Sequence, residues 1–285
     1  MGGTKRILIA EAGSSKTQWS LLNGSLQNVL RFDSNGINPV HLSPVEIQKE
    51  LLEIREKTGN KEVTAIKFFG AGCVDNDTVI LRALREIFNC EDVEVKSDMV
   101  AAAFALFGNT NGIAAILGTG SNSCFWENEA IRYKIPSLGY VLGDEGSGVA
   151  LGKALLNAVF KKGLPDEIAT EFQKRYHLSV ESLIQKTYKD SRPAKFLASF
   201  APFLLENANR EEVSELILNE FSLFFQRNIM RYPDYENLNI GFVGSIAFHF
   251  QNHLLEVAEK HKIKISKIMQ HPLPALEEFY SNLLN

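Results

Sequence analysis

The sequence predicts an α/β protein of two domains. Its 285 residues exceed the roughly 100–200 residues of a typical single domain. Apolar runs of strand length alternate along the chain with stretches in which apolar residues recur at helical spacing, as in α/β folds. In addition, a strand, a glycine turn and a second strand occur near the start and again 107 residues later. We therefore expect two related domains, each opening with such a hairpin.

The first half of the chain begins with an apolar strand at residues 7–10, a Gly/Ser turn, and a second strand at residues 17–22. Ser43, Pro44 and Glu46 predict a helix start, with a capping serine, proline at the first helical position and glutamate three residues after the cap. The other elements expected here are a strand at 65–69 ending in Gly70-Ala71-Gly72, a helix capped by Asp77, a strand at 93–95 ending at Ser97-Asp98, and a helix at 101–107.

The second half starts again with a strand at 113–117, a glycine turn and a strand at 123–126. When the two hairpins are aligned, Gly13 falls on Gly120 and Trp19 falls on Trp126. Residues 147–231 are predicted to be mostly helical, with caps at Ser147, Asp166, Ser179 and Asn209. The chain then offers a strand at 239–243, a helix from Gly244-Ser245 to about 260, a strand at 263–268 and a terminal helix at 276–284.

Composition excludes several classes of protein. The net charge of −4 argues against nucleic-acid binding. Cys73, Cys90 and Cys124 are far apart and form no Cys-x-x-Cys pair, so neither a disulfide framework nor a zinc site is indicated, and a reducing cytosol fits best. No apolar run reaches the ~18 residues that span a membrane, and the start lacks the apolar segment of a signal peptide. A cytoplasmic protein with no nucleic-acid or membrane partner is expected.

Two glycine turns have the chemistry of anion sites. Glycines bring backbone N–H groups close to an anion, and hydroxyl groups add donors. The turn Gly13-Ser14-Ser15-Lys16-Thr17 is not a Walker A loop, because the four-residue spacer and second glycine before the lysine are missing. Taken alone, this turn is better interpreted as a hairpin turn with polar residues. Together with Gly118-Thr119-Gly120-Ser121 it could clamp a triphosphate from two sides.

Two aspartates are candidates for substrate contacts. Asp144 lies in the glycine-rich string at residues 139–148, which reads either as a helix-capping loop or as a site whose carboxylate accepts hydrogen bonds from sugar hydroxyls. Asp98 follows a predicted strand, where α/β folds place ligands, but it could also cap the helix beginning near Met99. No zinc-ligand spacing of histidines and no Gly-x-Ser-x-Gly elbow offers a competing chemistry. Phe221, Phe224 and Phe225 lie at helical spacing and are expected in the core.

Six strings carry a family resemblance. They are residues 11–17 (EAGSSKT), 69–72 (FGAG), 97–98 (SD), 117–123 (LGTGSNS), 143–147 (GDEGS) and 242–247 (FVGSIA). In this order they resemble the N-acetylglucosamine kinase and BadF-type ATPase family of the actin–hexokinase-like superfamily, over about residues 7–280. The resemblance implies two ribonuclease-H-like domains around a central cleft. The expected domains are 1–110 plus 272–285, and 111–271 with a helical insertion.

The resemblance also implies a site that uses ATP and Mg²⁺. Gly13, Ser14, Ser15, Lys16 and Thr17 would form the first phosphate loop, and Gly118, Thr119, Gly120 and Ser121 the second. Gly244 and Ser245 would lie at the adenosine. Asp98 would be the catalytic base, and Asn38, Gly72, Asp98 and Asp144 would contact the sugar. Glu11 would help to hold Mg²⁺ through water. Most superfamily members carry aspartate there, and the longer side chain is tolerable if water lies between it and the metal.

The expected activity is transfer of the ATP γ-phosphoryl group to the 6-hydroxyl of an amino sugar, N-acetylglucosamine first. One alternative is a sensor that binds ATP or sugar without catalysis. Another is a BadF-type ATPase acting on a protein partner, whose iron–sulfur cluster between subunits needs cysteines in the second half, and no cysteine follows Cys124. The family suggests a homodimer, and the apolar helix at residues 213–229 is one candidate contact surface.

Overall fold

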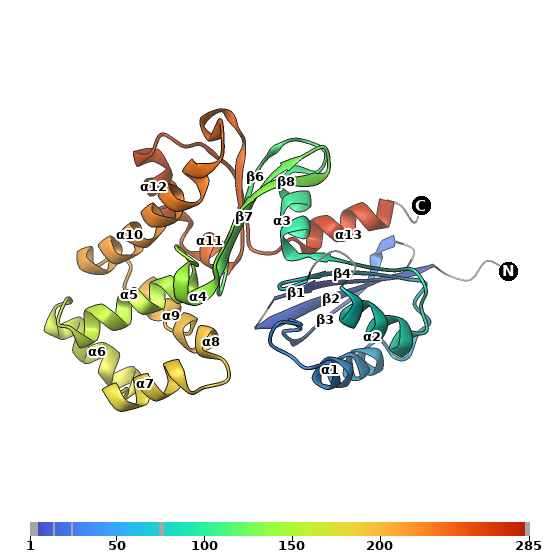
Figure 1. Ribbon diagram of the computed structural model, residues 1–285, viewed down its shortest axis with the longest axis horizontal. Coiled ribbons are helices and arrows are strands. Elements are labelled where there is room, and N and C mark those ends of the chain that lie inside the picture. The colour runs from blue at the N-terminus through green and yellow to red at the C-terminus, as the bar shows by residue number, and fades with distance from the viewer. Residues whose placement is uncertain (1–4, 14, 24, 74–76, 283–285) are drawn as a thin grey trace. The chain divides into compact units, whose positions relative to one another are not determined.

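The structure, a computed structural model, describes residues 5–13, 15–23, 25–73 and 77–282 (Figure 1). The chain divides into two compact units. The first comprises Met1–Asn109 with His271–Asn285, and the second comprises Thr110–Gln270. Each unit is built on its own five-stranded sheet with helices packed against it, which confirms the predicted α/β class. No described helix is long and apolar enough to cross a membrane.

The sheet of the first unit has the order β3-β2-β1-β4-β5. Strands β1, β2 and β3 are antiparallel neighbours, whereas β4 and β5 run parallel to β1. Parallel strands need crossover connections, and helices supply them here. The strands are β1 (Arg6–Ala12), β2 (Lys16–Asn23), β3 (Ser25–Asn35), β4 (Ala65–Gly70) and β5 (Val93–Ser97). The sequence did not predict β3.

Both faces of this sheet are covered, because successive side chains of a strand point to opposite sides. Leu8 and Ala10 of β1 face a core shared with α1 (Pro44–Lys57) and α2 (Thr78–Phe88). Ile7 and Ile9 face a second core shared with α3 (Asp98–Phe107) and α13 (Leu273–Asn282). The terminal helix therefore packs on the first unit, although the sequence preceding it belongs to the second.

Local capping chemistry sets the helix starts of the first unit. The Ser43 side chain accepts the N–H of Glu46, and the Glu46 side chain in turn accepts the N–H of Ser43, which is the predicted capping box. Asp77 Oδ1 accepts the N–H groups of Val79 and Ile80, at 3.0 and 3.1 Å. Both predicted starts are confirmed.

The second unit repeats the strand order of the first. Its sheet runs β8-β7-β6-β9-β10, so in both units the third, second, first, fourth and fifth strands lie side by side. The strands are β6 (Gly112–Leu117), β7 (Ser121–Glu127), β8 (Ala130–Ile135), β9 (Ile240–Val243) and β10 (Ile265–Met269). The alignment of the two tryptophans is wrong. Trp19 pairs with Ala10 near the turn, whereas Trp126 pairs with Gly112 at the far end of its hairpin. Each is buried in its own core, at non-equivalent positions.

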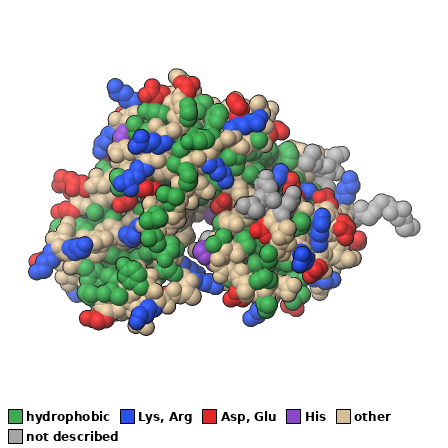
Figure 2. Space-filling model, in the orientation of Figure 1, with side chains coloured by type: hydrophobic (Ala, Val, Ile, Leu, Met, Phe, Trp, Pro, Cys, Tyr) green, Lys and Arg blue, Asp and Glu red, His purple; other side chains and the backbone are tan. Residues whose placement is uncertain are grey.

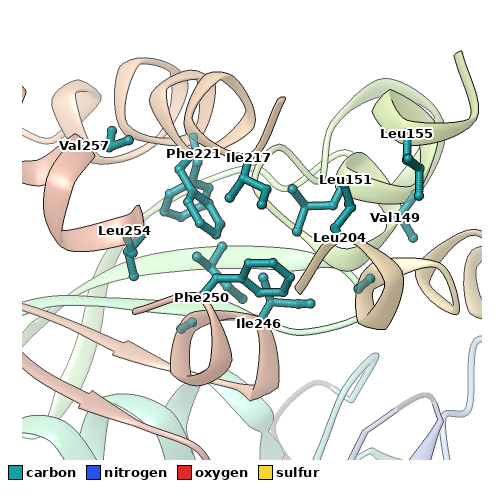
Figure 3. Close-up of a cluster of buried hydrophobic side chains, with 14 of the residues drawn as sticks. Val149, Leu151, Leu155, Leu204, Ile217, Phe221, Ile246, Phe250, Leu254 and Val257 are labelled. Carbon is teal, nitrogen blue, oxygen red and sulfur yellow. The ribbon is translucent and has the colours of Figure 1, made fainter. Parts of the chain in front are cut away.

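Helices fill most of the second unit (Figure 1). They are α4 (Gly139–Leu142), α5 (Gly148–Phe160), α6 (Asp166–Tyr176), α7 (Val180–Tyr188), α8 (Pro193–Ala198), α9 (Ala201–Glu206), α10 (Glu211–Arg227), α11 (Ser245–His249) and α12 (Gln251–Lys260), with short 3₁₀ turns at Ile229–Arg231 and Tyr235–Asn237. Their apolar faces meet in one core, drawn in Figure 3 around Leu151, Ile217, Phe221 and Phe250.

Three predictions about these helices need correction. The candidate contact surface on α10 is wrong, because Val213, Ile217 and the three predicted core phenylalanines are fully buried inside this unit. The predicted caps Asp166 and Asn209 miss by one residue, since Pro165 and Arg210 occupy the N-cap positions. The helix expected from Ser245 to about residue 260 is interrupted at Phe250, which divides it into α11 and α12.

Candidate functional site

The predicted site residues fall into two groups, one in each unit. In the first unit the parallel strands β1, β4 and β5 end at the same sheet edge, at Ala12, Gly70 and Ser97. Glu11 is the last residue but one of β1, and Asp98 follows directly on β5 as the first residue of α3. Loops at the carboxyl edge of such a sheet are where α/β folds bind ligands, so the topology puts both acids at that edge.

The two carboxylates influence each other. Burial, chiefly, and the negative charge of Asp98 raise the pKa of Glu11 from 4.5 to about 7, while the charge of Lys16 lowers it. The Lys16 ammonium itself lies 2.9 Å from the carboxylate of Asp33 on β3. A raised pKa beside a second carboxylate marks a position where a proton or a cation is favoured.

Asp98 sits at the start of a helix, but not as its cap. Ser97 occupies the N-cap position without a side-chain cap bond, and Asp98 Oδ1 accepts the N–H of Met99 at 2.9 Å. The predicted alternative, in which Asp98 is the N-cap residue, is therefore wrong by one position, because Asp98 is the first residue of the helix. An acid in the first turn is stabilised as an anion by the helix dipole. Asp98 therefore lies at the sheet edge with its carboxylate beside the first turn of α3.

Gly72 and Asn38 lie in direct contact in the same unit. Gly72 has φ +76°, and a Cβ atom there would lie 2.2 Å from Asn38 Oδ1. The Asn38 side chain is buried, and its Oδ1 accepts the N–H of Val40 at 2.9 Å. Only glycine allows this approach, so two residues predicted to contact the sugar form one structural unit.

The first glycine turn is held together largely by its own groups. The N–H of Gly13 donates to Lys16 O at 2.9 Å. Thr17 is fully buried, and its Oγ1 accepts the N–H of Ile37 at 3.1 Å, so this side chain positions the segment that carries Asn38. The predicted phosphate contact of Thr17 stays a prediction; in this structure its hydroxyl accepts a hydrogen bond from the backbone. Ser14 lies outside the described residues.

The second glycine turn is closed by hydrogen bonds from α5 and from Asp144. The N–H of Gly148 donates to Gly118 O at 2.9 Å, and the N–H of Val149 donates to Thr119 O at 3.1 Å. Ser121 N–H donates to Asp144 Oδ1 at 3.2 Å. This amide is therefore occupied, which removes one of the donors that the sequence assigned to a phosphate.

Asp144 lies directly against this turn. A Cβ atom on Gly120 would stand 2.8 Å from Asp144 Oδ2, so glycine is required beside the carboxylate. Asp144 is only 8% exposed, and burial raises its pKa, partly offset by the Ser121 N–H bond and by Lys153. The second glycine turn and Asp144 belong to separate motifs in the sequence, and the fold brings them into contact.

Helix α10 holds the loop that presents Asp144. Asp144 and Gly146 both have positive φ, +59° and +68°. Glu145 pairs with Arg227 at 3.1 Å and accepts a hydrogen bond from Asn228 Nδ2 at 3.5 Å. The N–H of Gly146 also donates to the Glu220 carboxylate. Sequence reasoning missed Glu220 and Arg227, because they stand more than seventy residues from the loop and show no motif.

Ser245, which follows Gly244, lines an apolar cavity of about 320 Å³ within the second unit. Gly244 has φ +124°, and a Cβ atom there would lie 2.2 Å from Leu117 O, so α11 approaches the end of β6 only because this residue is glycine. The cavity is mainly apolar with a few polar groups, as sites for flat organic rings are. Its lining comprises Gly118, Thr119, Gly148, Ala198, Ala201, Pro202, Leu205, Ser245, Ile246, His249 and Phe250.

The donor set of the first unit suits a hard cation. In the described part of the chain no group of three or more His, Cys, Asp or Glu side chains could hold a metal ion. Mg²⁺ is commonly bound through one or two carboxylates and completed by substrate phosphates and water. The pair formed by Glu11 and Asp98 meets that requirement. It offers too few ligands for a metal whose coordination sphere comes entirely from protein side chains.

Comparison with solved structures decides the family. The putative N-acetylglucosamine kinase of Porphyromonas gingivalis is 36% identical to this chain, with a TM-score of 0.92, and the match covers 97% of this chain and 99% of that one. The present chain belongs to that protein's family. No model of a protein family and no curated protein sequence matches the chain.

Two more distant structures share the fold of this family. The putative N-acetylglucosamine kinase of Chromobacterium violaceum has a TM-score of 0.72 at 15% identity, over the whole of both chains. A ROK family glucokinase of Streptomyces griseus, in complex with glucose and AMPPNP, has a TM-score of 0.56 at 12% identity and covers 98% and 97% of the two chains. At these identities they show the fold alone, which is the predicted two-domain, actin-like architecture.

Proposed function

We propose that the protein is an ATP-dependent sugar kinase that transfers the γ-phosphoryl group to the 6-hydroxyl of N-acetylglucosamine. The observation that carries the proposal is the 36% identity, over nearly the whole of both chains, to the P. gingivalis protein described as a putative N-acetylglucosamine kinase. The acids at the ends of β1 and β5 supply chemistry that suits the reaction.

Phosphoryl transfer needs mainly positioning and charge neutralisation, and a covalent nucleophile is not required. In the proposed reaction Asp98 accepts the proton of the attacking hydroxyl. Its position in the first turn of α3 places the carboxylate at the positive end of the helix dipole, which favours a negative charge there. Bound Mg²⁺ would neutralise charge on the phosphates, with Glu11 holding it through water. The raised pKa of Glu11 in the metal-free protein supports this role, because a cation would take the place of the proton.

The sugar contacts are assigned to Asn38, Gly72 and Asp144. Asn38 has a buried side chain in direct contact with Gly72, and Asp144 is fixed against the second glycine turn. In this arrangement a sugar hydroxyl and the phosphate turn are aligned by the same carboxylate. The cavity beside Gly244 and Ser245 is assigned to the adenosine, which is consistent with the ATP analogue bound by the S. griseus glucokinase.

Two alternatives stay separable by experiment. A sensor would bind ATP or sugar without turnover. A BadF-type ATPase would hydrolyse ATP for a protein partner, but its cluster-binding cysteines have no counterpart, since the three cysteines are buried and all precede residue 125. A cytoplasmic location and a homodimer remain part of the proposal.

The test is ADP release by the purified protein with ATP and Mg²⁺ against a panel of sugars that includes N-acetylglucosamine, glucosamine, N-acetylmannosamine and glucose. We expect release that depends on N-acetylglucosamine. Because a positioned base contributes roughly 10²–10⁴-fold, Asp98→Asn should slow turnover by about that factor while sugar binding survives. Release without any sugar would establish the ATPase instead. ATP binding with no release would establish the sensor.

A further inference from the structure

A second cavity of about 400 Å³ lies in the second unit, away from the residues assigned to the kinase site. It opens between α4, α5, α7 and α8, and its volume falls in the usual range for small-molecule sites. Tyr140 and Val141 come from α4, and Ile184 and Tyr188 come from α7. The remaining lining residues are Lys153, Leu156, Asn157, Phe160, Lys161, Leu183, Thr187 and Leu197.

The wall of this cavity is apolar, and much of it is exposed to solvent. Leu156 and Leu197 are buried at its floor. Val141, Ile184 and Tyr188, however, are 69%, 51% and 80% exposed although they are large and apolar. On the face shown in Figure 2, hydrophobic side chains gather over the region where Figure 1 draws α5 to α8. Exposed apolar side chains grouped around a concave surface indicate a binding site more than single ones do.

The charged residues of the lining indicate whether a ligand would be negatively or positively charged. Among the described residues that line the cavity, Lys153 and Lys161 are the charged ones, and none is acidic. Lys153 Nζ donates to Tyr140 O at 2.9 Å, and an ammonium group has three donors. Lys153 also faces the carboxylates of Asp144 and Glu220 outside the lining, whereas the lining itself carries only positive charge, which favours an anion.

We propose that this cavity binds a small amphipathic carboxylate, whose acid group pairs with Lys153 and Lys161 and whose aromatic or acyl part lies against Ile184 and Tyr188. The concave shape suits a small molecule. The test of this site needs no turnover.

The test uses 2-naphthoate and its neutral analogue 2-naphthalenemethanol, titrated into the full-length protein by isothermal calorimetry. For a ligand of about a dozen non-hydrogen atoms, a Kd at or below about 1 mM is expected. We expect one site per chain and binding of the alcohol at least about threefold weaker than that of the acid.

Matched variants locate the ligand. Ile184→Glu places a negative charge in the wall and should weaken binding at least about tenfold. Val180→Glu is the control, because Val180 is on the same helix, is equally exposed at 51%, and does not line the cavity. Leu205→Glu controls for the other apolar cavity and should leave binding unchanged.

Three results would overturn the proposal. They are equal binding of the acid and the alcohol, loss of binding in Leu205→Glu in place of Ile184→Glu, or no binding to a folded wild-type chain. If naphthoate fails to bind and Ile184→Glu converts an oligomer into a monomer, the face is an interface between copies of the chain. A failure of the sugar-kinase assay would leave this test unaffected.

Discussion

Replacing Gly72 by alanine tests the contact on which the proposed sugar site depends. The new Cβ atom would stand 2.2 Å from Asn38 Oδ1, well inside any contact distance, and φ at this position is +76°. The Asn38 side chain is buried, so it must leave its place or the backbone must shift. Displacement of the Asn38 side chain breaks the hydrogen bond from the N–H of Val40 to Asn38 Oδ1.

The loss of stability expected in Gly72→Ala has two contributions. The left-handed backbone conformation costs an alanine about 1–2 kcal/mol. Loss of the Asn38–Val40 hydrogen bond adds about 1 kcal/mol. Gly59→Ala is a matched control, because Gly59 has φ +68° in the same unit but a Cβ atom there would meet nothing within 4 Å. We therefore expect Gly72→Ala to destabilise the first unit by about 1 kcal/mol more than Gly59→Ala.

The assay exploits the two tryptophans, one in each unit. In a Trp126→Phe background, the fluorescence of Trp19 reports urea unfolding of the first unit. Displacement of Asn38 should also raise the KM for N-acetylglucosamine about tenfold or more in Gly72→Ala, while Gly59→Ala keeps the wild-type value. Equal stability and equal KM in the two variants would refute the contact and the role of Asn38 together. Equal KM with the expected stability difference would refute only the sugar role.

Three further predictions follow from other contacts. The pKa of Glu11 is about 7 in the folded chain, whereas its ordinary value is 4.5. This group should therefore lower the stability of the metal-free protein by up to about 3 kcal/mol between pH 4.5 and 7, and Glu11→Gln should reduce that slope in urea unfolding. Arg31→Met removes the partner of the Glu277 carboxylate, which is 1% exposed and lies 2.6 Å from the guanidinium. We expect the free energy of unfolding to fall by about 2–4 kcal/mol, because a buried carboxylate is left without its partner. The double variant with Glu277→Gln should recover part of that stability. Arg227→Met should raise the sugar KM several-fold through the Asp144 loop, and a double-mutant cycle with Glu145→Gln should show coupling of about 0.5 kcal/mol or more; additive effects would remove Arg227 from that role.

Elements with a strong local signal were predictable. The side chains of Ser43 and Asp77 accept hydrogen bonds from backbone N–H groups two or three residues further on. A helix start of this kind can therefore be recognised from a few neighbouring residues. Buried strands such as β1 and β6 are continuous apolar runs. In contrast, β3 and β8 were missed. The burial pattern of β8 shows mostly partly or fully exposed positions, and such an edge strand has little apolar periodicity to reveal it.

The candidate site was predictable only in part. Asp98 and the glycine turns could be proposed as site residues because each follows a strand whose end is visible in the sequence, whereas Glu11 was proposed from the family resemblance. The occupation of the Ser121 N–H by Asp144, and the burial of Thr17, were not visible, because each depends on a partner about twenty residues away. The same holds for the anchoring of Glu145 by Arg227 across 82 residues.

By itself the sequence determined the α/β class, the two hairpins and the identity of the acids, because these depend on periodicity, capping and residue type, which are local. The tertiary structure alone decided which donors of the glycine turns are already occupied and which glycines are obligatory. Gly72 and Gly120 are glycines because Asn38 Oδ1 and the Asp144 carboxylate lie where a Cβ atom would be. Such exclusions arise only when segments distant in the sequence pack together, since atoms cannot overlap.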